Sequence, residues 1–166
     1  MQFKVGDRVV HTAHGVGLIV KLDEKRLSGQ EARLYYEVTT QKCSVWVLAE
    51  SPEAIRLRPL TAKPHLPRYR SLLKSRPADL DRDHRKRHLE VAGRLKQGTF
   101  QVVCEVVRDL TARGWHRPLG ESDSAWLRKA REDLFQEWAA AEGVSIAEAA
   151  QEIDGLLRES RQRHMA

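Results

Sequence analysis

Residues 15–22, Gly15-Val16-Gly17-Leu18-Ile19-Val20-Lys21-Leu22, form a β-branched segment that opens with two glycines. Such a segment predicts a strand, and the glycines predict a tight turn or bulge where the backbone bends. No helical pattern follows the glycines, so they do not resemble a phosphate-binding loop. Similar segments occur at residues 8–11, 33–39, 43–48 and 55–57. Five short strands at a spacing of roughly 8–12 residues favour a small, strongly bent antiparallel barrel of the SH3 or Tudor kind.

The chain changes character after these strands. Three of its six prolines, Pro59, Pro64 and Pro67, lie close together and indicate a linker. From there to near the C-terminus, apolar residues recur at helical spacing. We therefore expect an α+β protein with a barrel domain at 1–60, a linker at 61–67 and a helical domain at 68–162.

Residues that end or cap helices divide the second half into five expected helices. Pro77 and the glycines at 98, 114 and 143 predict where helices end. Thr99 predicts a cap, and Ser145 with Glu148 matches a capping box. The first expected helix covers residues 68–76, and the second begins at the carboxylates of 79–83 and ends at about 97. The third covers 99–114, and the fourth begins at 120 or 122 and ends at 143. The fifth begins at 145 and has a tail that frays from 158.

Positive charge is concentrated where the barrel gives way to the helices. Residues 63–96 carry a net charge of +7, whereas residues 1–62 carry +2 and residues 97–166 carry −3. A localised basic segment favours a polyanionic partner, because each cation that neutralises a phosphate releases a condensed counterion. The densest cluster is His84-Arg85-Lys86-Arg87-His88, at the start of a helix that we expect Leu89, Ala92 and Leu95 to anchor.

Several classes of protein are not indicated by the sequence. It contains no nucleophile elbow, Walker loop, HExxH or CxxC, so we expect no enzyme, no cofactor and no small-molecule substrate. His11 and His14 lack a third ligand, which favours turn-lining histidines over a metal site. Cys43 and Cys104 have apolar neighbours and are expected to be buried free thiols. With neither an apolar leader nor a spanning segment, we expect a cytoplasmic protein without membrane contact.

Four blocks of sequence together resemble the CarD/CdnL family of bacterial transcription regulators. They are Phe3-Lys4-Val5-Gly6-Asp7-Arg8-Val9-Val10 with His14-Gly15-Val16-Gly17, Val45-Trp46-Val47-Leu48-Ala49-Glu50, Glu105-Val106-Val107-Arg108-Asp109-Leu110, and Leu127-x-x-Ala130 through Leu134-x-x-Glu137. The resemblance covers nearly the whole chain, in order. It implies a Tudor-like domain that binds the β subunit of RNA polymerase, and a helical domain that contacts promoter DNA at the upstream edge of the transcription bubble, largely without reading sequence.

The resemblance also assigns site residues. On the polymerase side it implies Lys25 and Trp46, with Val45 and Val47 beside them in the strand. If these valines point inward, Trp46 points outward, either as a rim-packing residue or as an interface anchor. The DNA-contacting candidates are the residues of the basic cluster, His84, Arg85, Lys86, Arg87 and His88, together with Arg68 and Arg70 on the preceding helix.

The sequence departs from the family pattern at the centre of the DNA site. The tryptophan that relatives wedge into the minor groove aligns with His84, and a further basic position aligns with Leu89. Lys86 and Arg87 keep the flanking cations. Contact with promoter DNA that stabilises the open complex is the first interpretation. A protein-interaction adaptor on the polymerase without a productive wedge is the alternative, and an RNA-binding protein, for which only Tyr69 would supply stacking, ranks last.

Overall fold

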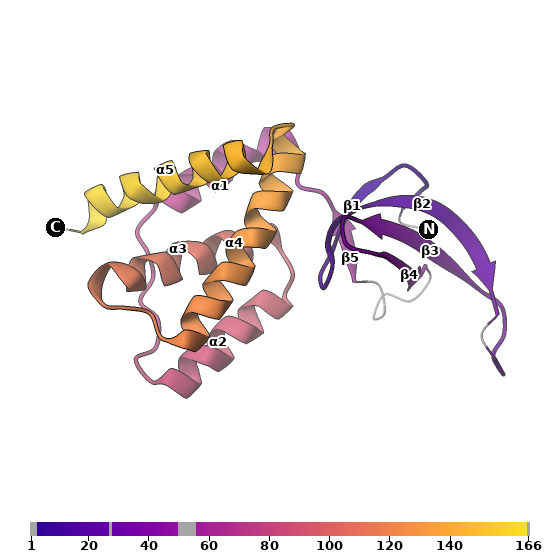
Figure 1. Ribbon diagram of the computed structural model, residues 1–166, viewed down its shortest axis with the longest axis horizontal. Coiled ribbons are helices and arrows are strands. Elements are labelled where there is room, and N and C mark those ends of the chain that lie inside the picture. Colours follow the sequence, from indigo (N-terminus) through magenta and orange to yellow (C-terminus); the bar gives the residue numbers. More distant parts are fainter. Residues whose placement is uncertain (1–2, 27, 50–55, 166) are drawn as a thin grey trace. The chain divides into compact units, whose positions relative to one another are not determined.

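The computed structural model describes residues 3–26, 28–49 and 56–165. The chain divides into two compact units, residues 1–60 and 61–166 (Figure 1). The first unit contains the described strands and the second contains the helices. The expected α+β class is confirmed. Within the described residues, none of the helices is both long and apolar enough to traverse a bilayer.

The first unit is a curved antiparallel sheet (Figure 1). Its strands are β1 (Arg8–His11), β2 (Gly15–Lys25), β3 (Arg33–Thr40), β4 (Ser44–Leu48) and β5 (Leu57–Pro59). Their order across the sheet is β4-β3-β2-β1-β5. All five expected strands are present, but Ile55 lies outside the described residues. Because β4 and β5 end the order of described strands, each has one edge with no described strand beside it.

Gly15 and Gly17 of β2 are required by different features of the backbone. Gly15 has a φ of 82° at the β1–β2 turn, in the region that side chains rarely adopt. A Cβ on Gly17 would lie 2.8 Å from Val38 Cγ1, so Gly17 permits a close approach of β3. The irregularity in strand pairing lies farther along β2, between Ile19 and Lys21.

One face of the sheet holds the core of the first unit. Ile19, Tyr36 and Val38 are completely buried, and Val47 joins them from β4. The Phe3 backbone N–H donates to the Tyr36 hydroxyl at 3.2 Å, which gives this buried polar atom a partner. Alternation along the strands therefore sends the intervening side chains to the opposite face.

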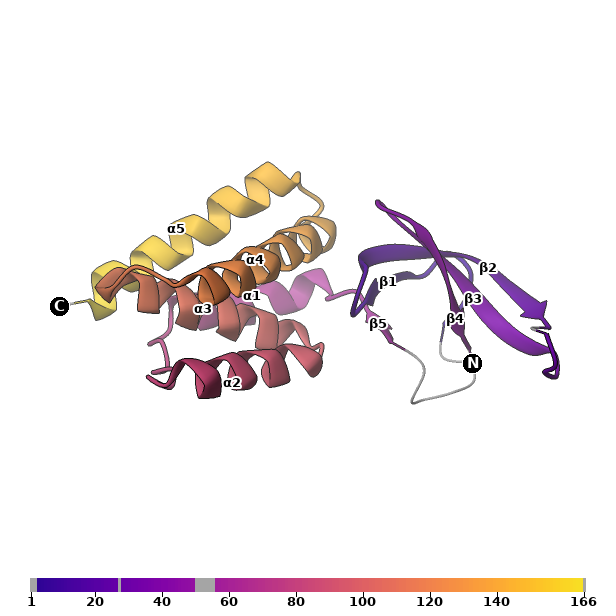
Figure 2. The same ribbon diagram turned by 60° about the horizontal axis from the view of Figure 1, so that its bottom comes forward.

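The second unit begins with a short 3₁₀ helix (Lys63–His65), inside the expected linker. Five α-helices follow: α1 (Leu66–Lys74), α2 (His84–Lys96), α3 (Phe100–His116), α4 (Glu121–Glu142) and α5 (Ile146–His164). Figures 1 and 2 both show α2 and α5 on opposite sides of this unit, with α3 and α4 between them. The core contains Leu110, Leu134, Trp138 and Ile153, all fully buried.

Side-chain caps set the starts of three helices. Asp83 accepts the Lys86 N–H at 3.0 Å to begin α2, and Thr99 accepts the Val102 N–H at 3.2 Å to begin α3. Ser145 and Glu148 form the reciprocal bonds of a capping box at α5. The Thr99 cap and the capping box were both predicted from the sequence and are confirmed.

Four expectations are wrong. Gly114 does not end α3, which continues to His116 because the residue before Pro118, not the glycine, is forced into an extended conformation. The tail from residue 158 does not fray, because Ser160 is buried against α1 and donates to the Ser75 carbonyl at 3.3 Å. Cys43 is exposed, although Cys104 is buried as expected.

The fourth concerns Leu89. This residue does not anchor α2, because its side chain is 70% exposed, whereas Val91 is buried. The inward face of α2 is therefore rotated from the one that the sequence suggested.

Candidate functional site

The start of α2 presents exposed cations. His84, Arg85 and Lys86 are exposed, and their side chains form no ion pair with any described residue. Leu89 lies four positions after Arg85 and three after Lys86, so it shares one side of the helix with both. We call these three residues the α2 face. It combines two mobile positive charges with one large, exposed apolar side chain.

Arg87 is turned away from the α2 face. Its side chain is 7% exposed, and its Nε donates to both carboxylate oxygens of Asp123 at 3.1 and 3.0 Å. Nη1 donates to the backbone carbonyls of Asp81 and Arg82. The contacts with Asp123 join α2 to α4, and the contacts with the two carbonyls hold the loop that precedes α2. The structure therefore removes Arg87 from the DNA-contacting candidates, because its guanidinium is buried and occupied.

His88 also packs against α4. Its Nδ1 accepts the indole N–H of Trp126 at 3.0 Å and lies 3.0 Å from Ser122 Oγ. Because Nδ1 acts as an acceptor here, the ring nitrogen of this half-buried residue is occupied within the helical unit. We assign His88 to the packing of α2 on α4. Trp126 lies in this contact and packs, partly buried, against the core of the unit.

The two arginines of α1 do not join the α2 face. Arg70 binds Glu142 and Glu152, and these carboxylates, Glu152 first, raise its pKa against the opposing effect of burial. Arg68 is exposed beside Tyr69, whose ring contacts Phe100 at 4.7 Å. Phe100 follows the C-terminal end of α2, about 20 Å along that helix from its start. The expected convergence of these cations on one surface is therefore absent.

The first unit brings two of the predicted polymerase-binding residues together. The Lys25 ammonium lies 3.4 Å from the centre of the Trp46 ring, a cation–π contact on the outer face of the sheet. The Trp46 side chain is 40% exposed. Val47 is buried and Val45 packs against the same core, so both point inward as expected. The Val47 side chain is therefore unavailable to a partner, whereas the Val45 side chain is only partly buried.

Two apolar residues near Trp46 were missed by the sequence analysis. Leu18 and Val20 of β2 are 42% and 41% exposed. Leu18 of β2 pairs with Thr39 of β3. Thr39 pairs in turn with Ser44 of β4, two residues before Trp46. Ile19 points into the core, so alternation could have identified its neighbours as outward-facing. The sheet thus has exposed apolar side chains on β2, separated from the described edge strand β4 by β3.

The His11–His14 turn is organised by its own hydrogen bonds. His11 Nδ1 accepts the backbone N–H groups of Ala13 and His14 at 3.0 and 3.2 Å. Burial, followed by the charges of His14 and Arg56, lowers the pKa of His11. Within the described ranges no group of three or more potential ligands could hold a metal ion. The histidines therefore serve the turn.

Comparison with known proteins agrees with this two-unit arrangement. The family model "CarD-like/TRCF RID domain" matches residues 3–56, and "CarD, C-terminal domain" matches residues 69–154. The chain belongs to the CarD family. It is also similar to the Bacillus subtilis (strain 168) protein named "Putative transcription factor YdeB", with 26% identity over 145 residues, 86% of this chain and 94% of the relative. This CarD-family chain is a transcription regulator, and its first unit is of a type that interacts with RNA polymerase.

Proposed function

We propose that this CarD-family protein docks on the β subunit of RNA polymerase through its sheet and contacts promoter DNA at the upstream edge of the bubble through the α2 face. The contact would stabilise the open complex. The observation that carries the DNA half is the exposure of Arg85 and Lys86 without ion-pair partners among the described residues. Cations in that state can exchange water and counterions for phosphates without breaking an internal contact.

The α2 face suits positioning on the DNA backbone more than base reading. Arg and Lys contacts to phosphates fix orientation but carry little sequence information. His84 adds an exposed ring at the first turn of α2, where the helix dipole favours anions. Leu89 is an apolar side chain of the type that can enter a minor groove. Electrostatics would therefore supply more of this contact than an aromatic wedge.

The sheet provides two means of binding the polymerase. Trp46, in contact with the Lys25 ammonium, is an exposed aromatic residue of a type enriched at interface hot spots. Strand β4 can also pair with a strand of the partner along the edge that no described strand occupies, in which case Val45 and Val47 contribute through the main chain. The side chains of Leu18 and Val20 lie on the same outer face and would be covered by such a partner.

The DNA half is tested by binding of the full-length protein to duplex promoter DNA across a salt series. The Arg85→Gln/Lys86→Gln variant should bind more weakly, and the slope of log K against log salt should fall by roughly two. The matched control is Arg128→Gln/Arg158→Gln, which removes two exposed arginines from other helices. Equal loss in both variants would mean that only total charge matters and would contradict the proposal.

The polymerase half is tested by pull-down of the full-length protein with the isolated β-subunit lobe. Trp46→Ala should reduce capture strongly, and Lys25→Ala should reduce it less, because the cation mainly orients the ring. Lys21→Ala, which removes an exposed lysine paired with Asp23, is the control and should leave capture unchanged. If the lobe is captured but no variant on the α2 face affects DNA, the adaptor interpretation replaces the proposed one.

A further inference from the structure

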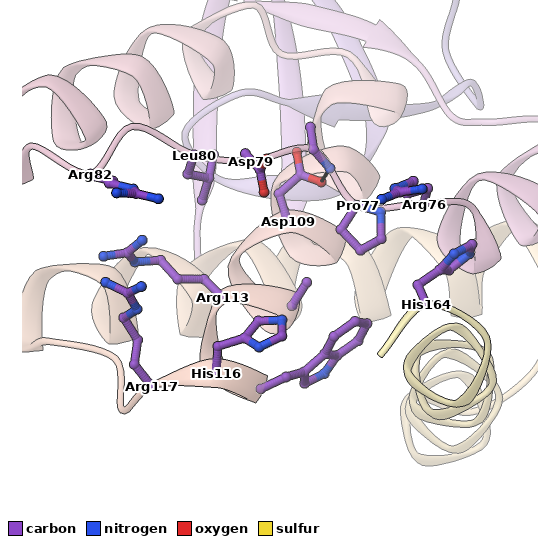
Figure 3. Close-up of a pocket in the computed structure, with 13 residues that line it drawn as sticks. Arg76, Pro77, Asp79, Leu80, Arg82, Asp109, Arg113, His116, Arg117 and His164 are labelled. Carbon is purple, nitrogen blue, oxygen red and sulfur yellow. Dashed lines mark hydrogen bonds between the residues drawn. The ribbon is translucent and has the colours of Figure 1, made fainter. Parts of the chain in front are cut away.

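A cavity of about 350 Å³ lies in the helical unit, apart from the α2 face (Figure 3). The loop between α1 and α2 forms one wall, and the last turns of α3 and α5 form the others. A volume of this size is at the lower end of the range for small-molecule sites. Duplex DNA cannot enter such a space, whereas a small ligand can.

The charged lining of the cavity is mostly positive. Arg76, Arg82, Arg113 and Arg117 line it, against the two carboxylates Asp79 and Asp109. The negative charge of Asp109 is balanced by Arg94 and Arg108, which both bind its carboxylate. The same carboxylate also accepts the Ala78 N–H. Figure 3 shows Arg82, Arg113 and Arg117 close together at one end, with His116 beside them. This end of the cavity is the positive end.

Among the described residues, one of the three arginines at the positive end pairs with a carboxylate. Arg113 binds Asp123. Arg82 and Arg117 have no ion pair with any residue that the structure describes. The pKa of Arg113 is lowered by burial and then by the charges of Arg87 and Arg117, which reflects crowding of like charges. An anion at this end would relieve that repulsion.

The rest of the lining offers apolar surface. Trp115 lines the cavity from the last turn of α3, together with Leu80 and the buried Ala112. Trp115 is half-buried here. An aromatic side chain beside arginines can stack on a base while the guanidinium groups bind phosphate in a bidentate manner. Asp79, exposed and without a described cation partner, can accept a hydrogen bond from a ribose hydroxyl or a base amino group.

We propose that this cavity binds a nucleoside phosphate, with the phosphates on Arg82 and Arg117 and the base against Trp115. The site is separate from the α2 face and does not rest on the proposed DNA contact. Its ligand would act as an effector, since the cavity holds no group arranged for catalysis. Because the α1–α2 loop forms one wall and leads directly into Asp83, the cap of α2, a bound ligand would order the segment that precedes the α2 face.

The test is isothermal titration calorimetry of the full-length protein with ATP, GTP and sodium pyrophosphate. Arg82→Gln/Arg117→Gln should weaken nucleotide binding by roughly tenfold or more, since two charge-assisted contacts are lost. Trp115→Leu should weaken ATP and GTP binding but leave pyrophosphate binding unchanged. Arg128→Gln/Arg158→Gln and Arg85→Gln/Lys86→Gln should bind like the wild type. Thermal unfolding of each variant checks that the fold is retained.

Three results would overturn the proposal. One is the absence of nucleotide binding to the wild type at millimolar ligand. Another is a pattern of binding that does not depend on the cavity residues. Nucleotide affinity would then fall equally in the Arg128→Gln/Arg158→Gln control, or pyrophosphate and ATP would bind equally with no effect of Trp115→Leu. The third is a loss of DNA affinity in Arg82→Gln/Arg117→Gln without any nucleotide binding, which would make the cavity wall a DNA contact. None of these depends on whether the α2 face binds DNA.

Discussion

Arg87 and Asp123 form a buried ion pair that joins α2 to α4, with Nε 3.1 and 3.0 Å from the two carboxylate oxygens. The pair lies directly behind the exposed Arg85 and Lys86. It holds α2 in the rotation that turns these cations outward. Arg113 approaches the same carboxylate, with 3.5 Å between its Nε and Asp123 Oδ2. The basic cluster at the start of α2 thus has an exposed part and a structural part.

Breaking the buried pair should destabilise the helical unit. We expect Arg87→Met to lower its free energy of unfolding by about 3–5 kcal/mol, because a buried carboxylate is left without its main partner. Urea unfolding followed by far-ultraviolet circular dichroism measures this. The Arg87→Met/Asp123→Leu variant should recover much of the loss. A loss below about 1 kcal/mol in Arg87→Met would contradict the structural role, since surface ion pairs have that magnitude.

Adding a cation at Leu89 should strengthen DNA binding. Leu89 is 70% exposed, so Leu89→Lys costs little packing and places a third charge on the α2 face. The slope of log K against log salt should steepen by roughly one. Gln151→Lys, at an exposed position of α5, is the control for added charge. If Leu89→Lys instead weakens binding, the apolar side chain itself contacts the DNA.

The first unit should lose stability in mild acid through His11. Its folded pKa lies below the ordinary value of 6.5, because burial and then His14 and Arg56 oppose the charged form. The unfolded chain therefore binds the proton more readily, and stability should fall as the pH drops below about 6.5 towards the folded pKa. His11→Asn keeps an acceptor for the turn and should remove this dependence. Urea unfolding at several pH values, followed by a probe in the sheet, checks it.

The fold was largely predictable because its signals are local. Alternation gave the strands, and Thr99 with the Ser145–Glu148 box gave two helix starts. The site was less predictable, because a run of three cations between two histidines does not show which of them faces the interior of the helical unit. Asp123, which binds the Arg87 guanidinium in the interior, is 36 positions away in the chain. Lys25 and Trp46 were each indicated, but they lie on different strands, 21 positions apart in the chain, and only the folded sheet brings them into contact.

The lifetime of the open promoter complex tests the central claim most directly. It can be followed by the decay of competitor-resistant complexes formed by RNA polymerase with the wild-type protein or with Arg85→Gln/Lys86→Gln. We expect the wild type to lengthen this lifetime. The variant should bind polymerase normally but lengthen the lifetime much less. Arg128→Gln/Arg158→Gln should behave as the wild type. An unchanged lifetime with the α2-face variant would contradict the claim that α2 links the polymerase to DNA.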